Sequence, residues 1–222
     1  MNSLALAALT FTGLHLLVSG TRLRGALVAR LGALPYRGLF SLASAGALAW
    51  LIWAYIKAHV PQATPLAEWR WLAIALVFIA FVLIVLGLLT PGPTLVGAEK
   101  LVEQEARGVH RITRHPFLWG VTLWALVHMV FNPDAAALLF FGTFALVGSV
   151  GTFSIDAKRA RALGERWLRY AAKTSNVPFA AIAQGRNALA PGEIGIVKIV
   201  AAAGAFGFFA LFHAKFFGLP PF

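Results

Sequence analysis

The sequence predicts an all-α membrane protein, a bundle of about six transmembrane helices forming one domain over residues 1–222. Hydrophobic residues make up 59% of the chain and charged residues 12%, which is roughly half the charged share of an ordinary soluble domain. The apolar residues lie in blocks close to the ~20 residues that one crossing of a bilayer needs. Most basic residues gather in the loops between these blocks, as membrane topology requires.

We expect the spans at residues 3–20, 38–57, 70–89, 115–131, 135–154 and 192–213. The first resembles a signal peptide, but its opening residues are uncharged, and Arg22 and Arg24 follow the apolar stretch instead of preceding it. That order is typical of an uncleaved helix with its N-terminus outside. Because the first span is weak, five helices remain an alternative.

The basic residues predict the orientation of the spans. Three alternate loops hold 15 of the 19 Lys and Arg residues, namely Arg22, Arg24, Arg30 and Arg37, then Lys100, Arg107, Arg111 and Arg114, then Lys158, Arg159, Arg161, Arg166, Arg169, Lys173 and Arg186. Loops rich in Lys and Arg stay in the cytoplasm. Both termini are therefore predicted outside.

The net charge of +11 is also explained by the membrane. Residues 155–173 read as a basic amphipathic helix with Ile155, Leu163, Trp167 and Tyr170 among its charges. Such a helix lies on the anionic inner leaflet. We expect membrane lipid as the partner of these charges, and no nucleic acid, because the basic residues form no basic soluble face.

The chain has no cysteine and six histidines, which limits its possible chemistry. Disulfides, thiolate metal sites, iron–sulfur clusters and a cysteine nucleophile are excluded. Histidine is left as the strong neutral metal ligand. The sequence also has no Gly-rich phosphate loop and no nucleophile elbow, so hydrolase and ATPase functions have no support.

Two histidines fall inside predicted spans, where ionisable side chains usually face the bundle interior. His15 shares one helical face with Thr12, Ser19 and Arg22. This stripe is either a hydrogen-bonding seam between helices or a ligand for a buried metal or cofactor. His128 shares a face with Trp124 in the fourth span, and it either donates to a neighbouring carbonyl or also binds a cofactor.

Two buried histidines on separate helices favour a b-type haem, which axial imidazoles hold. Trp124 would then wall the pocket and Thr12 would orient a ligand imidazole. By helical rise, His15 and His128 differ in height by about 11 Å. A haem that joined them would therefore be tilted strongly toward the membrane plane.

Arg114-His115-Pro116 opens the fourth span, with the proline suited to the first helical turn. A helix N-terminus attracts anions and keeps an imidazole neutral. Arg114 and His115 therefore predict a site for a carboxylate or phosphate at the inner face, with lipid headgroup contact as the alternative. Asp156 either faces this site or pairs with Lys158 and Arg159.

Several stretches resemble the NnrU family of membrane proteins. They include Gly13-Leu14-His15, Arg111-Ile112-Thr113-Arg114-His115-Pro116, Trp124-Ala125-Leu126-Val127-His128 and Thr174-Ser175-Asn176-Val177-Pro178-Phe179. The resemblance implies a place in the bacterial inner membrane and a link to nitrite and nitric oxide reduction. The family is also similar to 15-cis-zeta-carotene isomerase, which uses haem b to isomerise a polyene.

By this resemblance His15 and His128 match the haem ligands, and a carotenoid or another lipid-soluble polyene or isoprenoid is the implied substrate. Ala125 stands where the isomerase has a cysteine, so control through that thiol is absent here. The Arg-His-Pro motif is also similar to membrane methyltransferases and sterol reductases, where it contacts a nucleotide-type cofactor. A non-enzymatic assembly factor with structural histidines is the third alternative.

Overall fold

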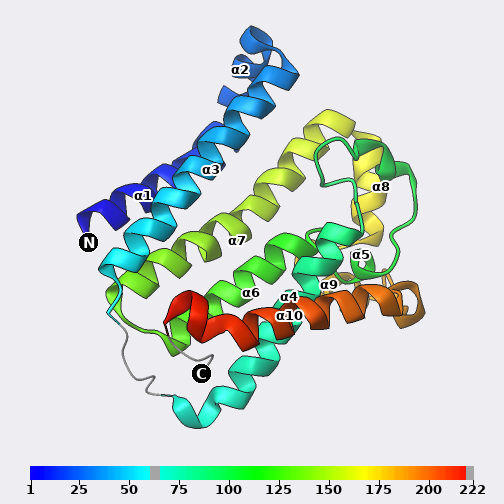
Figure 1. Ribbon diagram of the computed structural model, residues 1–222. Helices are drawn as coiled ribbons and strands as arrows, with labels where there is room; N and C mark the ends of the chain where they lie inside the picture. Colours follow the sequence, from blue (N-terminus) through cyan, green and yellow to red (C-terminus); the bar gives the residue numbers. More distant parts are fainter. Residues whose placement is uncertain (61–65, 219–222) are drawn as a thin grey trace.

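The computed structural model describes residues 1–60 and 66–218, and these residues form helices joined by loops, with no strands (Figure 1). The long helices are α1 with its extension η1 (Asn2–Thr12 and Gly13–Val18), α3 (Ala33–Ala58), α4 (Arg70–Leu89), α6 (Pro116–Phe131), α7 (Ala135–Leu163) and α10 (Ile196–Phe217). Shorter elements connect them: α2 (Leu23–Leu31), η2 (Ala67–Trp69), η3 (Glu99–Glu103), α5 (Val109–Ile112), α8 (Glu165–Lys173), α9 (Ala180–Ala183) and η4 (Pro191–Glu193).

The prediction of an all-α membrane bundle is confirmed. The lengths of the helices indicate which of them could cross a bilayer. Helices α3, α4, α7 and α10 are long and apolar enough to cross a bilayer, and the bent pair formed by Asn2–Val18 and Leu23–Leu31 would be a fifth. The remaining expected span corresponds to α6, an apolar helix of 16 residues. A helix of that length is slightly shorter than a straight crossing needs.

The helices are arranged side by side, so that α7 lies between the N-terminal pair and the rest (Figure 1). Helix α1 packs on both α3 and α7, while α6 packs on α7 and α4, and α10 packs on α4. Close backbone approach holds α4 against α6: a Cβ on Gly120 would lie 2.7 Å from the carbonyl oxygen of Ala80. Small residues at such crossings let helix backbones meet inside a membrane.

A π-helical turn replaces the end of the first predicted span. The amide of Ser19 donates to the carbonyl of Leu14 at 3.0 Å, five residues back, and the chain then bends by 79° into α2. Two side chains of α7 hold this bend: Ser154 donates to the Gly20 carbonyl and Lys158 to the Ser19 carbonyl. Single π turns of this kind are frequent at functional sites.

The inner-face segments fold back on the bundle. Helix α7 continues to Leu163, the chain turns at Gly164, and α8 begins at Glu165, so residues 155–173 are two helices where one was expected. Trp167 and Tyr170 of α8 are buried against Val102. Trp167 and Tyr170 of this amphipathic helix are therefore covered by protein, while Leu168 stays 54% exposed. The predicted contact of the helix with the inner leaflet stays a prediction.

Candidate functional site

His15 lies in the π turn, and its ring is fixed by its own helix. Its Nδ1 is 2.8 Å from the carbonyl oxygen of Phe11. Because a carbonyl only accepts, Nδ1 must carry the proton, which leaves Nε2 as the atom able to bind a metal. Phe11, and not Thr12 as the sequence suggested, therefore supplies the group that orients this imidazole.

His128, near the other end of the bundle, has the same arrangement. Its Nδ1 is 2.8 Å from the carbonyl oxygen of Trp124, one turn earlier in α6. The Trp124 ring lies 5.0 Å from the imidazole, which confirms the predicted neighbour. Both in-membrane histidines therefore have a defined tautomer with Nε2 as the ligating atom, as metal-bound histidines usually do.

A run of aromatic rings joins the two histidines across α7. His15 contacts Phe11 at 4.2 Å between ring centres, and Phe11 contacts Phe144 at 5.6 Å. Phe144 in turn lies 5.7 Å from Trp124, beside His128. The two imidazoles thus lie on helices that flank the same aromatic face of α7, with these rings between them.

Arg114 and His115, the other predicted site residues, meet a single carboxylate at the inner face. The guanidinium of Arg114 donates to both oxygens of Asp156, at 2.6 and 3.4 Å, and Nε2 of His115 lies 2.7 Å from Oδ1. Asn176 adds a fourth hydrogen bond at 2.9 Å. The sequence left two alternatives for Asp156, which were this site or a pairing with Lys158 and Arg159. In the structure Asp156 pairs with Arg114 and His115.

The remaining donors of Arg114 are also occupied, because its Nη1 contacts the Thr174 hydroxyl at 3.2 Å and the Ala171 carbonyl at 3.4 Å. Its guanidinium lies 5.5 Å from the centre of the Trp167 ring. His115 precedes α6, and burial lowers its pKa even though Asp156 opposes the shift. We call Arg114, His115, Asp156, Thr174 and Asn176 the inner-face network.

Asn176 and Thr174 were not singled out as site residues from the sequence. They are uncharged, they lie about 60 residues from Arg114, and only the folding of the loop after α8 brings them there. The one signal was their place in the stretch that resembles the NnrU family. The backbone confirms the docking of this loop, because the Arg114 amide donates to the Ser175 carbonyl at 2.9 Å.

A second ion pair ties α5 to the start of α10. Arg111 contacts both oxygens of Glu193 at 2.8 Å, and the Gly108 amide donates to the same carboxylate at 2.8 Å. The hydrogen bond from Arg111 holds the pKa of Glu193 at about 2 and raises the pKa of Arg111. Arg111 therefore has a protein partner in place of the lipid headgroup that the sequence suggested.

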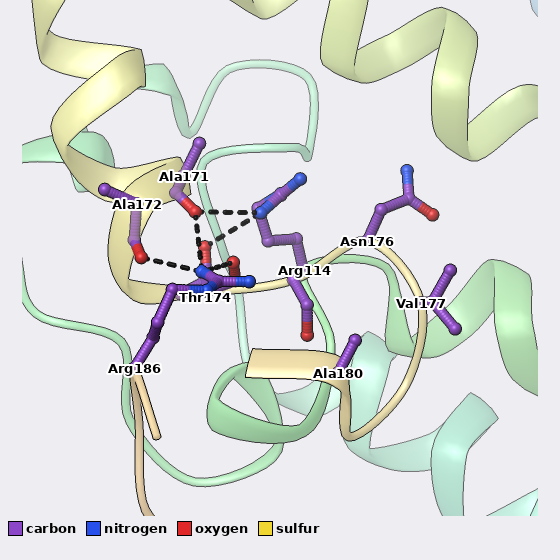
Figure 2. A pocket seen from close by; sticks show the side chains of 9 residues that line it. Arg114, Ala171, Ala172, Thr174, Asn176, Val177, Ala180 and Arg186 are labelled. Atoms are coloured by element: carbon purple, nitrogen blue, oxygen red, sulfur yellow. Dashed lines mark hydrogen bonds between the residues drawn. The ribbon is translucent and has the colours of Figure 1, made fainter. Parts of the chain in front are cut away.

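A shallow pocket of about 510 Å³ opens beside the inner-face network (Figure 2). Arg186 enters it and donates to the carbonyls of Ala172 and Thr174, at 2.6 and 2.8 Å. Figure 2 shows Arg186 and Arg114 converging on the Ala171 carbonyl. Both guanidiniums thus donate to backbone carbonyls at the end of α8, which ties this pocket to the loop that follows the helix.

The other histidines of the outer half have protein neighbours. Nδ1 of His59, after α3, lies 3.2 Å from a carboxylate oxygen of Asp134, and Asp134 also caps α7. His213 of α10 lies near enough to His128 for their charges to interact. Within residues 1–60 and 66–218, no group of three or more His, Asp or Glu side chains could hold a metal ion.

Comparison with known proteins places the whole chain in one family. Residues 3–221 match the family described as NnrU protein. The 15-cis-zeta-carotene isomerase of Arabidopsis thaliana is 33% identical over 84 residues, and that of Zea mays is 33% identical over 87 residues, both chloroplastic. Each match covers 37% of this chain and 22% of the relative. No solved structure matches the chain.

Proposed function

Because this chain belongs to the NnrU protein family, we propose that it is a haem b-binding protein of the inner membrane whose axial ligands are His15 and His128. We further propose that it isomerises a cis double bond of a lipid-soluble polyene. The carotenoid part rests on the similarity to 15-cis-zeta-carotene isomerase, of which the chain spans about a fifth of the length.

The observation that carries the proposal is that both imidazole rings are oriented by the same hydrogen bond. Each is fixed through Nδ1 to the carbonyl four residues earlier, at 2.8 Å in both cases. Two such imidazoles on different helices are the donor set that haem b accepts. His115, by contrast, gives its Nε2 to Asp156 and is a poorer candidate.

The surroundings also suit an apolar, planar cofactor. The face of α7 between the histidines presents Phe144 and Phe141, and Trp124 packs on both. Aromatic walls exclude water and contact flat ligands well. A porphyrin bound to both histidines would have to part Phe11 from Phe144, whose ring centres are 5.6 Å apart.

Each residue then has a definite task. His15 and His128 would bind the haem iron through Nε2. The carbonyls of Phe11 and Trp124 keep the proton of each imidazole on Nδ1, and the aromatic rings exclude water. When bound, haem supplies an iron whose affinity for further ligands depends on its redox state. A polyene needs no polar recognition, so it can reach this layer from the lipid.

An absorption spectrum of the purified protein tests the proposal. The full chain, made in haem-replete cells and purified in detergent, should show a sharp Soret band that His15→Ala and His128→Ala each abolish or shift. His213→Ala, which removes a third in-membrane histidine near His128, is the matched control and should leave the band unchanged. A colourless protein, or a band that only His213→Ala removes, contradicts the assignment.

The substrate is tested separately. The coloured protein is reduced and mixed with 15-cis-zeta-carotene in detergent micelles, and the isomers are separated by liquid chromatography. Haem-dependent loss of the cis isomer supports the isomerase. A haem protein that binds nitric oxide but leaves the polyene unchanged would favour the role in nitrite or nitric oxide reduction.

A further inference from the structure

Two hydroxyl groups of α3 are buried without a hydrogen-bond partner among the described residues. They are Oη of Tyr36 and Oγ of Ser44. Tyr36 is only 6% exposed. Buried polar groups nearly always have a partner in native proteins, and an unmet hydroxyl is costly. A partner outside the chain explains such a group.

The two hydroxyls lie on the face of α3 that meets His15. Tyr36, Phe40 and Ser44 are spaced by four residues and so share one helical face. Phe40 contacts the imidazole of His15 at 5.7 Å between ring centres, and Tyr36 stacks on Phe40 at 5.9 Å. Tyr36 thus lies one turn from the level of His15, on the side of the basic first loop.

Positive charge surrounds the Tyr36 end of this face. The guanidinium carbon of Arg24, in α2, lies 5.8 Å from the centre of the Tyr36 ring. Lys158 of α7 is near enough to Arg24 for their charges to repel. Within the described residues, neither Arg24 nor Lys158 forms an ion pair with a carboxylate.

A neutral donor and two cations without an acidic partner are what an anion requires. We propose that Tyr36, with Arg24 and Lys158, binds a carboxylate of the cofactor that His15 holds. This inference rests on the proposed function, and for haem b the carboxylate is a propionate. Tyr36 is a positioning residue: its hydroxyl fixes the edge of the ring while His15 fixes the iron.

Ser44 provides an internal control. It lies eight residues from Tyr36, or about 12 Å along the helix axis. One carboxylate cannot reach both hydroxyls. Removing either hydroxyl should leave the empty protein as stable as the wild type or more so, since neither hydroxyl has a hydrogen-bond partner among residues 1–60 and 66–218. Only the loss of the Tyr36 hydroxyl should weaken the hold on the cofactor.

The test measures how fast the loaded, full-length protein gives up haem to excess apomyoglobin. Tyr36→Phe keeps the ring and removes only the hydroxyl, and it should release haem about tenfold faster, as expected for one hydrogen bond to a charged group. Ser44→Ala should match the wild type. With haem dimethyl ester, whose uncharged ester carbonyls accept a weaker hydrogen bond than a carboxylate does, the difference in release rate between Tyr36→Phe and the wild type should become clearly smaller.

The possible outcomes distinguish a failure of this inference from a failure of the proposed function. A wild type that takes up no haem overturns the proposed function and this inference together. A loaded wild type that releases haem no more slowly than Tyr36→Phe overturns this inference alone. An undiminished difference with the dimethyl ester also overturns it, because the hydroxyl would then act independently of the carboxylate charge.

Discussion

The inner-face network and the surroundings of His15 both place polar groups in an apolar bundle. The two regions differ in how many of these groups have hydrogen-bond partners. Asp156 receives four hydrogen bonds from Arg114, His115 and Asn176. Tyr36, one turn of α3 from the level of His15, has a buried hydroxyl with no hydrogen-bond partner among the described residues. The carboxylate of Asp156 is thus satisfied by the chain itself, although Oδ1 of Asn176 in the same network has no partner among the described residues. The Tyr36 hydroxyl makes no hydrogen bond at all among those residues, which is why we assign it to a bound group.

The largest expected effect follows from removing the carboxylate at the centre of the inner-face network. Asp156→Ala leaves the guanidinium of Arg114 buried without its carboxylate, since Arg114 is 8% exposed. Removing one partner of a buried ion pair costs about 3–5 kcal/mol. Thermal unfolding in detergent, followed by circular dichroism, should therefore show a large fall in the midpoint.

The control for that variant is an exposed ion pair of the same face. Glu105 and Lys173 are 3.2 Å apart with side chains 74% and 68% exposed. Glu105→Ala should cost under about 1 kcal/mol. If Asp156→Ala were no worse than Glu105→Ala, the inner-face network would not be the structural element described here.

A smaller effect is expected at the π turn that presents His15. A Cβ on Gly20 would overlap the carbonyl of Leu16, whereas a Cβ on Gly13 would meet nothing within 4 Å. Gly20→Ala should therefore destabilise the protein by about 1–3 kcal/mol, as overpacking does. It should also shift the Soret band by moving the imidazole of His15.

Gly13→Ala is the matched control within the same turn. Alanine loses less conformational freedom than glycine on folding, so this change should raise stability by up to about 1 kcal/mol. Equal melting midpoints for Gly13→Ala and Gly20→Ala would mean that the π turn is not constrained as the structure indicates.

The smallest effect concerns pH and the pair between Arg111 and Glu193. Its hydrogen bond with Arg111 lowers the pKa of Glu193 from 4.5 to about 2. A carboxyl with a depressed pKa stabilises the folded state fully above its unfolded pKa, and this contribution is lost as the pH falls through the folded value. The advantage of wild type over Glu193→Gln should thus be constant near pH 7 and shrink between about pH 4.5 and 2.

Melting midpoints of the two proteins at several pH values would check this. Because Glu193 is exposed, added salt should also narrow the difference at pH 7. A difference that stays the same from pH 7 to pH 2 would show that the carboxylate charge contributes nothing at this contact.

Much of the architecture could be predicted because hydropathy and caps are local signals. Pro116 begins α6 and Asp134 caps α7, as their residue types favour. The first predicted span ends in a π turn and a bend, and the number of spans stays a prediction. The π turn itself could not be predicted, because it depends on how Ser154 and Lys158 of α7 hold the chain.

The inner-face network could be predicted only in part. Arg114 and His115 were visible as a motif at a helix start, but Asp156 had two possible partners in sequence. Asn176 reaches Asp156 only because the loop after α8 folds back, a long-range contact that no spacing reveals. For the same reason the burial of Trp167 and Tyr170 of α8 against Val102 could not be predicted from the sequence.

Electron paramagnetic resonance of the ferric protein tests the central claim most directly, because it reports the ligands of the iron. Two axial imidazoles should give a low-spin spectrum in the wild type, and His15→Ala and His128→Ala should each convert it to high spin. His213→Ala should not. An iron that stays low-spin in both variants, or a wild type with no haem iron at all, would contradict the assignment of His15 and His128.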